Sequence, residues 1–227
     1  MFDSISDAAL MALIGLVGGA VLGLAARLGR FCTLGAIEDY LYQGSDRRMR
    51  MWVLAIAVAG VCTFSLIAAG LLDPARTMYH TAPFSPLGSI LGGLVFGYGM
   101  SLAGTCGFGA LARSGGGDLR AFVIVLVMGV ASYVMISGPL AAARVWLVDA
   151  TTINTTLRSI PDAVEEITGI SSVYVGLGLS LSLLVIALSS ASFRANKASV
   201  FWGGAVGLSV AESWAATFWV MTHGFSA

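Results

Sequence analysis

Two cysteine residues carry the most distinctive chemistry in this sequence. Cys32 and Cys106 each begin a Cys-x-x-Gly-Ala segment, CTLGA at 32–36 and CGFGA at 106–110. A thiol is a weak hydrogen-bond donor with a polarizable sulfur atom. It suits a soft sulfur-containing solute such as thiosulfate better than a hard oxyanion such as phosphate. The alternative, a cysteine acting as a small buried hydrophobic residue, is our interpretation of Cys62, which lies in an uninterrupted apolar run.

Charged residues near these segments are candidates for contact with an anion. Arg27 and Arg30 shortly precede Cys32, where they either attract an anion or extend to the membrane interface. Arg113 is better explained as a cytoplasmic anchor. Glu212 lies near the middle of the last apolar run, where an acidic side chain is costly and is usually functional or paired. We therefore include Arg30 in the candidate substrate site, with Arg27 and Glu212 as further candidates.

Several other functions are disfavoured by composition. The formal net charge is zero, so no overall field attracts nucleic acid. Three cysteines without a Cys-x-x-Cys pair do not predict a disulfide framework or a zinc site. The glycine-rich stretch at 114–118 lacks the Gly-Lys-Ser/Thr of a nucleotide-binding loop. We expect no cofactor, no metal and no use of ATP.

The elements that must position these residues are membrane helices. The sequence is 57% hydrophobic and 11% charged, and its 29 glycines suit closely packed membrane helices. Asp3 and Asp7 before the first apolar run indicate a retained helix rather than a signal peptide. Apolar runs of spanning length occur at 8–28, 51–72, 86–103, 121–143, 173–192 and 199–221. The predicted fold class is an all-α, polytopic integral membrane bundle.

The connections between these runs predict an orientation. Acidic or mixed connections alternate with basic ones, which carry Arg47, Arg48 and Arg50, then Arg113 and Arg120, then Arg194 and Lys197. The positive-inside rule places the basic connections in the cytoplasm. The prediction is a multi-pass protein of a bacterial-type inner membrane with both termini outside.

Two stretches, 27–42 and 104–117, are too polar and glycine-rich for a plain spanning helix. Irregular backbone at membrane depth persists only where protein or a water-filled cavity surrounds it. We therefore expect short broken or re-entrant helices there. The amino termini of such half-helices would present partial positive charge to an anion.

The sequence GRFC at 29–32, with LAGTCGFG at 102–109 and RSGGG at 113–117, resembles the YeeE/YedE family of sulfur transport proteins. The resemblance implies two similar halves, short non-spanning helices at the centre, and thiosulfate uptake. It implies that Cys32 and Cys106 hold thiosulfate through sulfur hydrogen bonds and pass it along a cysteine relay. The substrate site implied by this match also contains Arg30, Gly104, Gly107 and Gly109. A TusA-like sulfur-carrier protein is an expected partner.

The resemblance also predicts a division of the chain. Residues 1–143 would form a first membrane half-repeat containing both cysteine segments, 144–172 a periplasmic connection, and 173–227 the start of a second half-repeat. A later cysteine motif of the family is absent. A fragment, a truncated form and a divergent member all fit this absence, and an oligomer or partner chain would then complete the path.

Three functions remain open at this stage. The first is a transporter or channel-like permease for thiosulfate or a related sulfur compound, which is not an enzyme. The second is a membrane thiol-disulfide oxidoreductase, which a redox-dependent disulfide between Cys32 and Cys106 would favour. The third is a structural subunit of a membrane complex.

Overall fold

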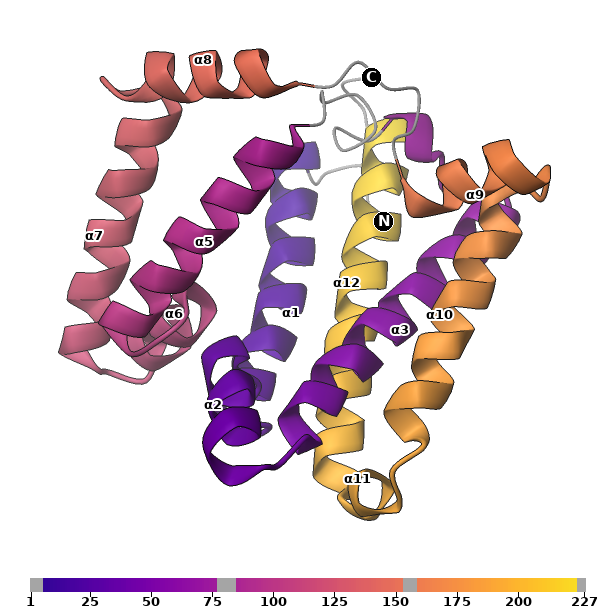
Figure 1. Cartoon of the computed structure of the whole chain (residues 1–227), viewed down its shortest axis with the longest axis horizontal. Helices are drawn as coiled ribbons and strands as arrows, with labels where there is room; N and C mark the ends of the chain where they lie inside the picture. The colour runs from indigo at the N-terminus through magenta and orange to yellow at the C-terminus, as the bar shows by residue number, and fades with distance from the viewer. Residues whose placement is uncertain (1–5, 77–84, 153–158, 224–227) are drawn as a thin grey trace. The chain divides into compact units, whose positions relative to one another are not determined.

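The secondary structure is helical throughout the residues that the computed structural model describes, 6–76, 85–152 and 159–223. The described residues contain no strand (Figure 1). Contacts between Cα atoms divide the chain into two compact units. Unit 1 comprises residues 1–77 and 159–227, and unit 2 comprises residues 78–158. The predicted all-α membrane fold class is therefore confirmed.

Unit 1 is built around a row of four long helices. Its elements are α1 (Asp7–Arg27), α2 (Thr33–Gln43), α3 (Arg47–Ala68), the 3-10 turn η1 (Pro74–Arg76), α9 (Ile160–Thr168), α10 (Ser172–Leu188), α11 (Ala191–Ala195) and α12 (Lys197–His223). Helix α1 packs on α12, α12 packs on α3, and α3 packs on α10 (Figure 1). The first and last of these helices in the sequence are thus direct neighbours.

Glycines let α12 approach its neighbour α3 closely. A Cβ atom at Gly207 would lie 2.6 Å from the carbonyl oxygen of Ala55, and one at Gly203 would lie 3.0 Å from that of Met51. Both glycines face α3 at a four-residue spacing, as small residues do in closely packed membrane helices. By contrast, a Cβ atom at Gly19 in α1 would meet nothing within 4 Å among the described residues.

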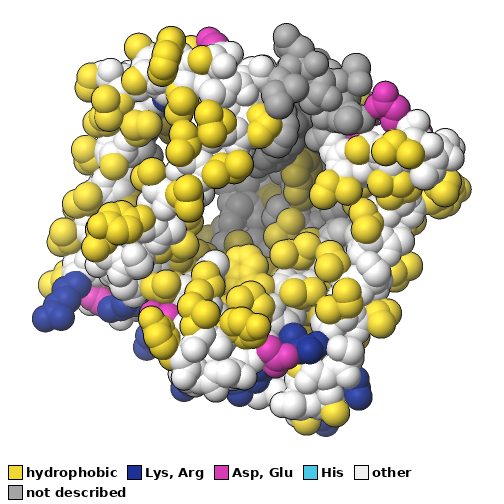
Figure 2. All heavy atoms as spheres, in the orientation of Figure 1, with side chains coloured by type: hydrophobic (Ala, Val, Ile, Leu, Met, Phe, Trp, Pro, Cys, Tyr) yellow, Lys and Arg dark blue, Asp and Glu magenta, His cyan; other side chains and the backbone are white. Residues whose placement is uncertain are grey.

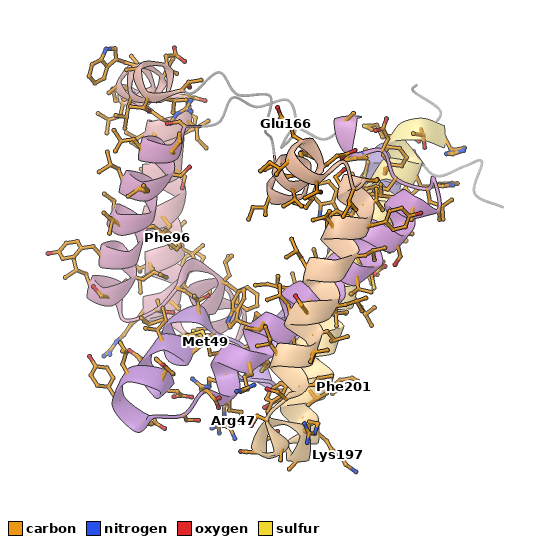
Figure 3. The ribbon with its side chains drawn as sticks, turned by 45° about the vertical axis from the view of Figure 1, so that its right-hand side comes forward. Arg47, Met49, Phe96, Glu166, Lys197 and Phe201 are labelled. Carbon is orange, nitrogen blue, oxygen red and sulfur yellow. The ribbon has the colours of Figure 1, made fainter. Side chains whose placement is uncertain are left out.

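Several basic residues of unit 1 lie at one end of it, whereas Arg76 of η1 follows the other end of α3. The Arg50 guanidinium, near the start of α3, donates to the Ile186 carbonyl at 2.7 Å and to Ser189 Oγ at 3.0 Å, near the end of α10. Arg47 and Lys197 lie at this end, whereas Glu166 of α9 lies at the opposite end (Figure 3). Within unit 1, the structure therefore supports the predicted separation of basic and acidic connections.

Unit 2 contains α5 (Pro86–Ala103), α6 (Gly107–Gly115), α7 (Leu119–Ile136) and α8 (Ala141–Thr151). Helix α6 packs against α7, and α8 contacts both α5 and α7. None of the residues of α5 is buried, and Ala121 is the buried residue of α7. These two apolar helices therefore have large surfaces available for lipid or for other protein.

Among the described residues, four helical segments are long and apolar enough to span a membrane: Asp7–Arg27, Arg47–Ala68, Pro86–Gly115, which comprises α5 and α6, and Leu119–Ile136. Hydrophobic side chains are spread over the face shown in Figure 2, interspersed with backbone and other side chains. Six spans were predicted. The remaining two helices are present, but α10 has 17 residues and α12, which includes Glu212, is not among the four.

The predicted run 121–143 is wrong at its end. Helix α7 stops at Ile136, and the chain resumes in α8 at Ala141. The physical reason is the sequence Ser137-Gly138-Pro139, because proline disfavours helical backbone in the residue before it and lacks an N–H group. The predicted connection 144–172 also contains ordered helix, since it includes much of α8 and all of α9.

Candidate functional site

Cys32 and Cys106 occupy equivalent positions in two short helices. Each is the N-cap residue, immediately before the first turn of α2 and of α6 respectively. Both have extended backbone, with φ −153° and ψ 130° at Cys32 and φ −83° and ψ 161° at Cys106. The first N–H groups of a helix have no partner within it, so an N-cap side chain lies beside several unsatisfied donors. The two cysteines belong to different units and are described separately.

The backbone leading into each cysteine is also similar. Arg30, two residues before Cys32, has a left-handed φ of 53°, and Gly104, two residues before Cys106, has a φ of 63°. The helix breaks predicted within 27–42 and 104–117 are thus present. Glycine adopts this conformation without strain, so Gly104 has a clear backbone role. Arg30 is the one non-glycine residue with positive φ in the described ranges, and it is exposed.

The Cys-x-x-Gly-Ala pattern marks the first turn of each short helix. Ala36 is 1% exposed and Ala110 is 0% exposed, so the alanine of each segment faces protein. The cysteine precedes the helix and the glycine is its third residue. The shared pattern therefore has a shared local structure.

In unit 1, an arginine from the following helix lies over the first turn of α2. A Cβ atom at Gly35 would overlap Nη1 of Arg48 and would lie 3.7 Å from Cys32 Cβ. Only glycine therefore leaves room for this guanidinium beside the cysteine. Cys32 makes no side-chain capping bond to α2. Cys32, the first turn of α2 and a guanidinium thus meet in one small region.

Arg48 is held in place by an ion pair. Its Nε lies 3.2 Å from Oδ2 of Asp39, a residue of α2 that is 9% exposed. Although this distance is short, the buried Nε has no hydrogen-bond partner, so its N–H does not point well toward the carboxylate. The pair fixes the guanidinium over α2 and leaves donor capacity for an anion.

Arg48 is a candidate site residue that the sequence analysis missed. It was assigned to a cytoplasmic connection together with its neighbours Arg47 and Arg50. Arg27 and Arg30 were preferred because they are closer to Cys32 in sequence, but both are exposed. The available signal was Asp39 within a segment expected at membrane depth, since an acidic residue there requires a nearby cation.

In unit 2, Cys106 is buried and caps its own helix. The residue is 3% exposed, and its Sγ accepts a hydrogen bond from the Gly109 N–H at 3.2 Å. Gly107 lies against α7, where a Cβ atom would be 2.7 Å from Cε of Met128. Gly107 and Gly109 therefore have identified local roles, one in packing and one in capping. Within this unit, the Cys106 thiol is covered by protein.

Arg113 is engaged at the far end of α6. Its Nη2 lies 2.7 Å from Oδ2 of Asp118, the N-cap residue of α7. The hydrogen bond from Arg113, followed by that from the Ala121 N–H, holds the pKa of Asp118 below its usual 3.8. Because the pKa of Asp118 is lower in the folded state, its ionised carboxylate stabilises the fold fully above about pH 3.8. This stabilisation is lost as the pH falls through the lowered pKa of the folded state. The pairing agrees with a structural role for Arg113.

Glu212 lines a different part of unit 1. An open groove of about 670 Å³ contains Glu212 and Cys62, and Cys32 is not among its lining residues. The structure therefore separates this sequence candidate from Cys32. Cys62, which was interpreted as structural, lines the groove together with it.

The candidate helical spans and the two interrupted segments define an all-helical, polytopic membrane protein. The Sulphur transport family matches residues 28–226, and the chain belongs to this family. The predicted YeeE/YedE resemblance is therefore confirmed.

Two curated relatives share part of this chain. The chain is 38% identical over 125 residues to the thiosulfate transporter TsuA of Escherichia coli (strain K12). The aligned region covers 55% of the chain and 34% of that protein. It is 31% identical over 133 residues to the thiosulfate transporter TsuA of Spirochaeta thermophila, which covers 59% of the chain and 39% of that protein. The matches thus span little more than a third of each relative.

Proposed function

We propose that this chain takes up thiosulfate, or a related small sulfur-containing anion, along a path lined in part by Cys32 and Cys106. The observation that carries the proposal is the matched placement of the two cysteines, each as the N-cap of a short helix between long ones. Membership of the Sulphur transport family and the names of its two relatives agree with this substrate class.

The chemistry around Cys32 fits such an anion. The thiol donates a weak hydrogen bond and offers polarizable sulfur to the terminal sulfur atom of thiosulfate. The first turn of α2 adds partial positive charge, and helix amino termini are established positions for anions. Arg48 adds a planar, permanently charged donor group. Arg30 and Arg27, at the exposed end of α1 that leads into α2, would add positive charge close to this point.

The proposed relay requires no covalent change in the protein. Thiosulfate exchanges one set of thiol hydrogen bonds for the next, and both thiols end as they began. Because Cys106 Sγ is engaged with the Gly109 N–H, the anion competes with this local bond when it reaches the second thiol. Gly104 and Gly107 contribute by shaping the backbone there.

The remaining assignments follow from charge. We place the protein in the inner membrane with the Arg47 and Lys197 end of unit 1 in the cytoplasm, because basic residues favour that side. A TusA-like sulfur carrier would receive the solute at this end.

The test is uptake of radiolabelled thiosulfate by cells that lack their own sulfate and thiosulfate importers. The intact chain should give uptake above an empty-vector control, and excess unlabelled thiosulfate should suppress it while phosphate does not. Membrane levels of the protein are measured in parallel. Uptake equal to the vector control at a verified membrane level would contradict the proposed function, and equal competition by phosphate would contradict the thiol-based selectivity.

A further inference from the structure

An open groove runs along α12 between its two neighbours in unit 1. It has a volume of about 670 Å³ and receives Val21 from α1 and Cys62, Ser65 and Leu66 from α3. Helix α12 contributes Ala205, Leu208, Ser209, Ala211, Glu212 and Ala215. Most of these side chains are apolar or small. Glu212 is the one charged residue of this lining.

Glu212 lies near the mid-depth of the helices around it. A Cβ atom at Gly18 of α1 would touch the hydroxyls of Ser213 at 3.1 Å and Ser209 at 3.4 Å. Gly18 is close to the centre of α1, a helix long and apolar enough to span the membrane. Glu212 lies between these two serines in sequence, so it is level with the middle of that span. Along α12 it is roughly 22 Å from Lys197 at a rise of 1.5 Å per residue.

Glu212 is exposed at the surface of unit 1, and the described residues of this unit give it neither an ion pair nor a hydrogen bond. The other titratable group in the groove is the Cys62 thiol. The charged residues of the packed helices are Asp7 and Arg27 of α1, Arg47, Arg48 and Arg50 of α3, Arg194 of α11, and Lys197 and His223 of α12. All of them lie outside the groove.

An unpaired acidic side chain at membrane depth is costly, and such residues commonly serve proton or ion pathways. Structural pairing would require a basic partner, which the described residues of unit 1 do not supply at this depth. A carboxylate that takes up a proton removes this cost while the proton is bound. The hydroxyls of Ser65 and Ser209 and the thiol of Cys62 provide the groove with polar groups beside it.

We propose that Glu212 is a proton-binding site that couples anion uptake to proton entry. This proposal rests on the proposed function and adds its energy source. A thiosulfate ion carries two negative charges, so its inward movement opposes a membrane potential that is negative inside. Glu212 takes a proton from the outer side, remains the neutral acid while the anion moves inward, and then releases the proton to the cytoplasm. One proton enters with each thiosulfate ion and compensates one of its two negative charges, the proton gradient drives this entry, and the carboxylate is restored.

The experiment uses the full chain reconstituted in proteoliposomes and compares two assays. Counterflow measures exchange of labelled for unlabelled thiosulfate and needs no driving force. Gradient-driven uptake measures accumulation with an acidic outside and a neutral inside, against no gradient and against an inward sodium gradient. We expect the acidic outside to raise the initial uptake rate several-fold and the sodium gradient to leave it unchanged.

Glu212→Gln replaces the carboxylate with a neutral group of the same size. It should retain counterflow and lose the response to the pH gradient, while Glu212→Asp should retain part of that response. Glu166→Gln, which removes an exposed carboxylate of α9 in the same unit (Figure 3), should behave like the intact protein in both assays.

The outcomes separate the coupling proposal from the proposed function. If the intact chain shows no counterflow, transport itself is contradicted and the coupling with it. If counterflow is present but the pH gradient has no effect, or if Glu212→Gln keeps the full pH response, only the coupling is overturned. Loss of counterflow in a stably folded Glu212→Gln would also overturn it, because Glu212 would then belong to the permeation path.

Discussion

At the scale of single residues, cysteine occupies two N-cap positions at which helices usually have serine, threonine or aspartate. Serine caps α1 and α5 and aspartate caps α7 in this protein, whereas Cys32 and Cys106 precede α2 and α6. A thiol is a poorer cap than a hydroxyl, because it is a weaker hydrogen-bonding group. Its presence at both positions therefore favours a role in recognition over one in stability alone.

The pair of cysteines was predictable from sequence because the segments repeat, but Arg48 was not. Its approach to Gly35 depends on how α3 packs on α2, and the sequence spacing does not reveal that packing. Arg27 and Arg30 are adjacent to Cys32 in sequence, yet their side chains are exposed. Closeness in sequence did not predict which arginine lies beside Cys32, because the chain turns sharply at Arg30.

Replacing Gly35 with alanine tests the position of Arg48. The new Cβ atom overlaps Nη1, so the guanidinium must leave the first turn of α2 and the pair with Asp39 weakens. We expect thiosulfate uptake to fall about tenfold, the loss for one hydrogen bond to a charged group. Gly19→Ala in α1, where a Cβ meets nothing within 4 Å, is the matched control. Equal uptake by both variants would place Arg48 outside the site.

Replacing Arg30 with glycine separates the effect of its backbone conformation from the effect of its side chain. Glycine accepts the left-handed φ of 53°, so the substitution removes about 1 kcal/mol of strain together with the guanidinium. We expect an unchanged or higher melting temperature in detergent and lower thiosulfate uptake. Undiminished uptake would show that Arg30 has no part in anion handling.

At the scale of elements, hydropathy located the long helices well but not their ends or partners. All six predicted apolar runs correspond to helices, because burial in lipid requires continuous apolar sequence. The end of α7 was missed, since Gly138 and Pro139 interrupt a run that remains apolar beyond Ile136. The short helices α2 and α6 were expected as breaks, since glycine and polar residues there interrupt the apolar pattern.

The contact between α12 and α3 provides a stability test at this scale. Gly207→Ala places a Cβ atom 2.6 Å from the Ala55 carbonyl and 2.8 Å from Val58 Cβ, so the helices must separate. Overpacking of this kind costs about 1–3 kcal/mol, and the melting temperature in detergent should fall by several degrees. Gly204→Ala, which meets nothing within 4 Å, should leave it unchanged. Equal melting temperatures would contradict the close packing of these helices.

At the scale of the whole molecule, unit 1 joins parts of the chain that are distant in sequence. Helix α12 lies between α1 and α3, and the predicted half-repeats, which separate 1–143 from 173–227, did not anticipate this contact. Such pairing depends on side-chain fit between helices, which an apolar pattern alone does not encode. The half-repeats themselves remain a prediction. The separation of basic from acidic connections, by contrast, could be predicted from the sequence, because it depends only on which charged residues each connection contains. The side of the membrane on which they lie remains a prediction.

The orientation of unit 1 can be tested with introduced cysteines. In a chain whose three native cysteines are replaced by alanine, Glu166→Cys should react with a membrane-impermeant maleimide in intact spheroplasts. Lys197→Cys should react only after the membrane is permeabilised, because the basic end faces the cytoplasm. Reversed labelling would contradict the assigned orientation, and labelling of both sites in intact spheroplasts would contradict a membrane-spanning unit.

The central claim is that Cys32 and Cys106, and not Cys62, contact the transported anion. The most direct measurement is the initial rate of thiosulfate uptake by Cys32→Ala, Cys106→Ala and Cys62→Ala at equal membrane levels. The account predicts that each of the first two variants loses about tenfold or more, as expected for one lost hydrogen bond to an anion, while Cys62→Ala keeps most of its activity. Full uptake by Cys32→Ala and Cys106→Ala would contradict the account.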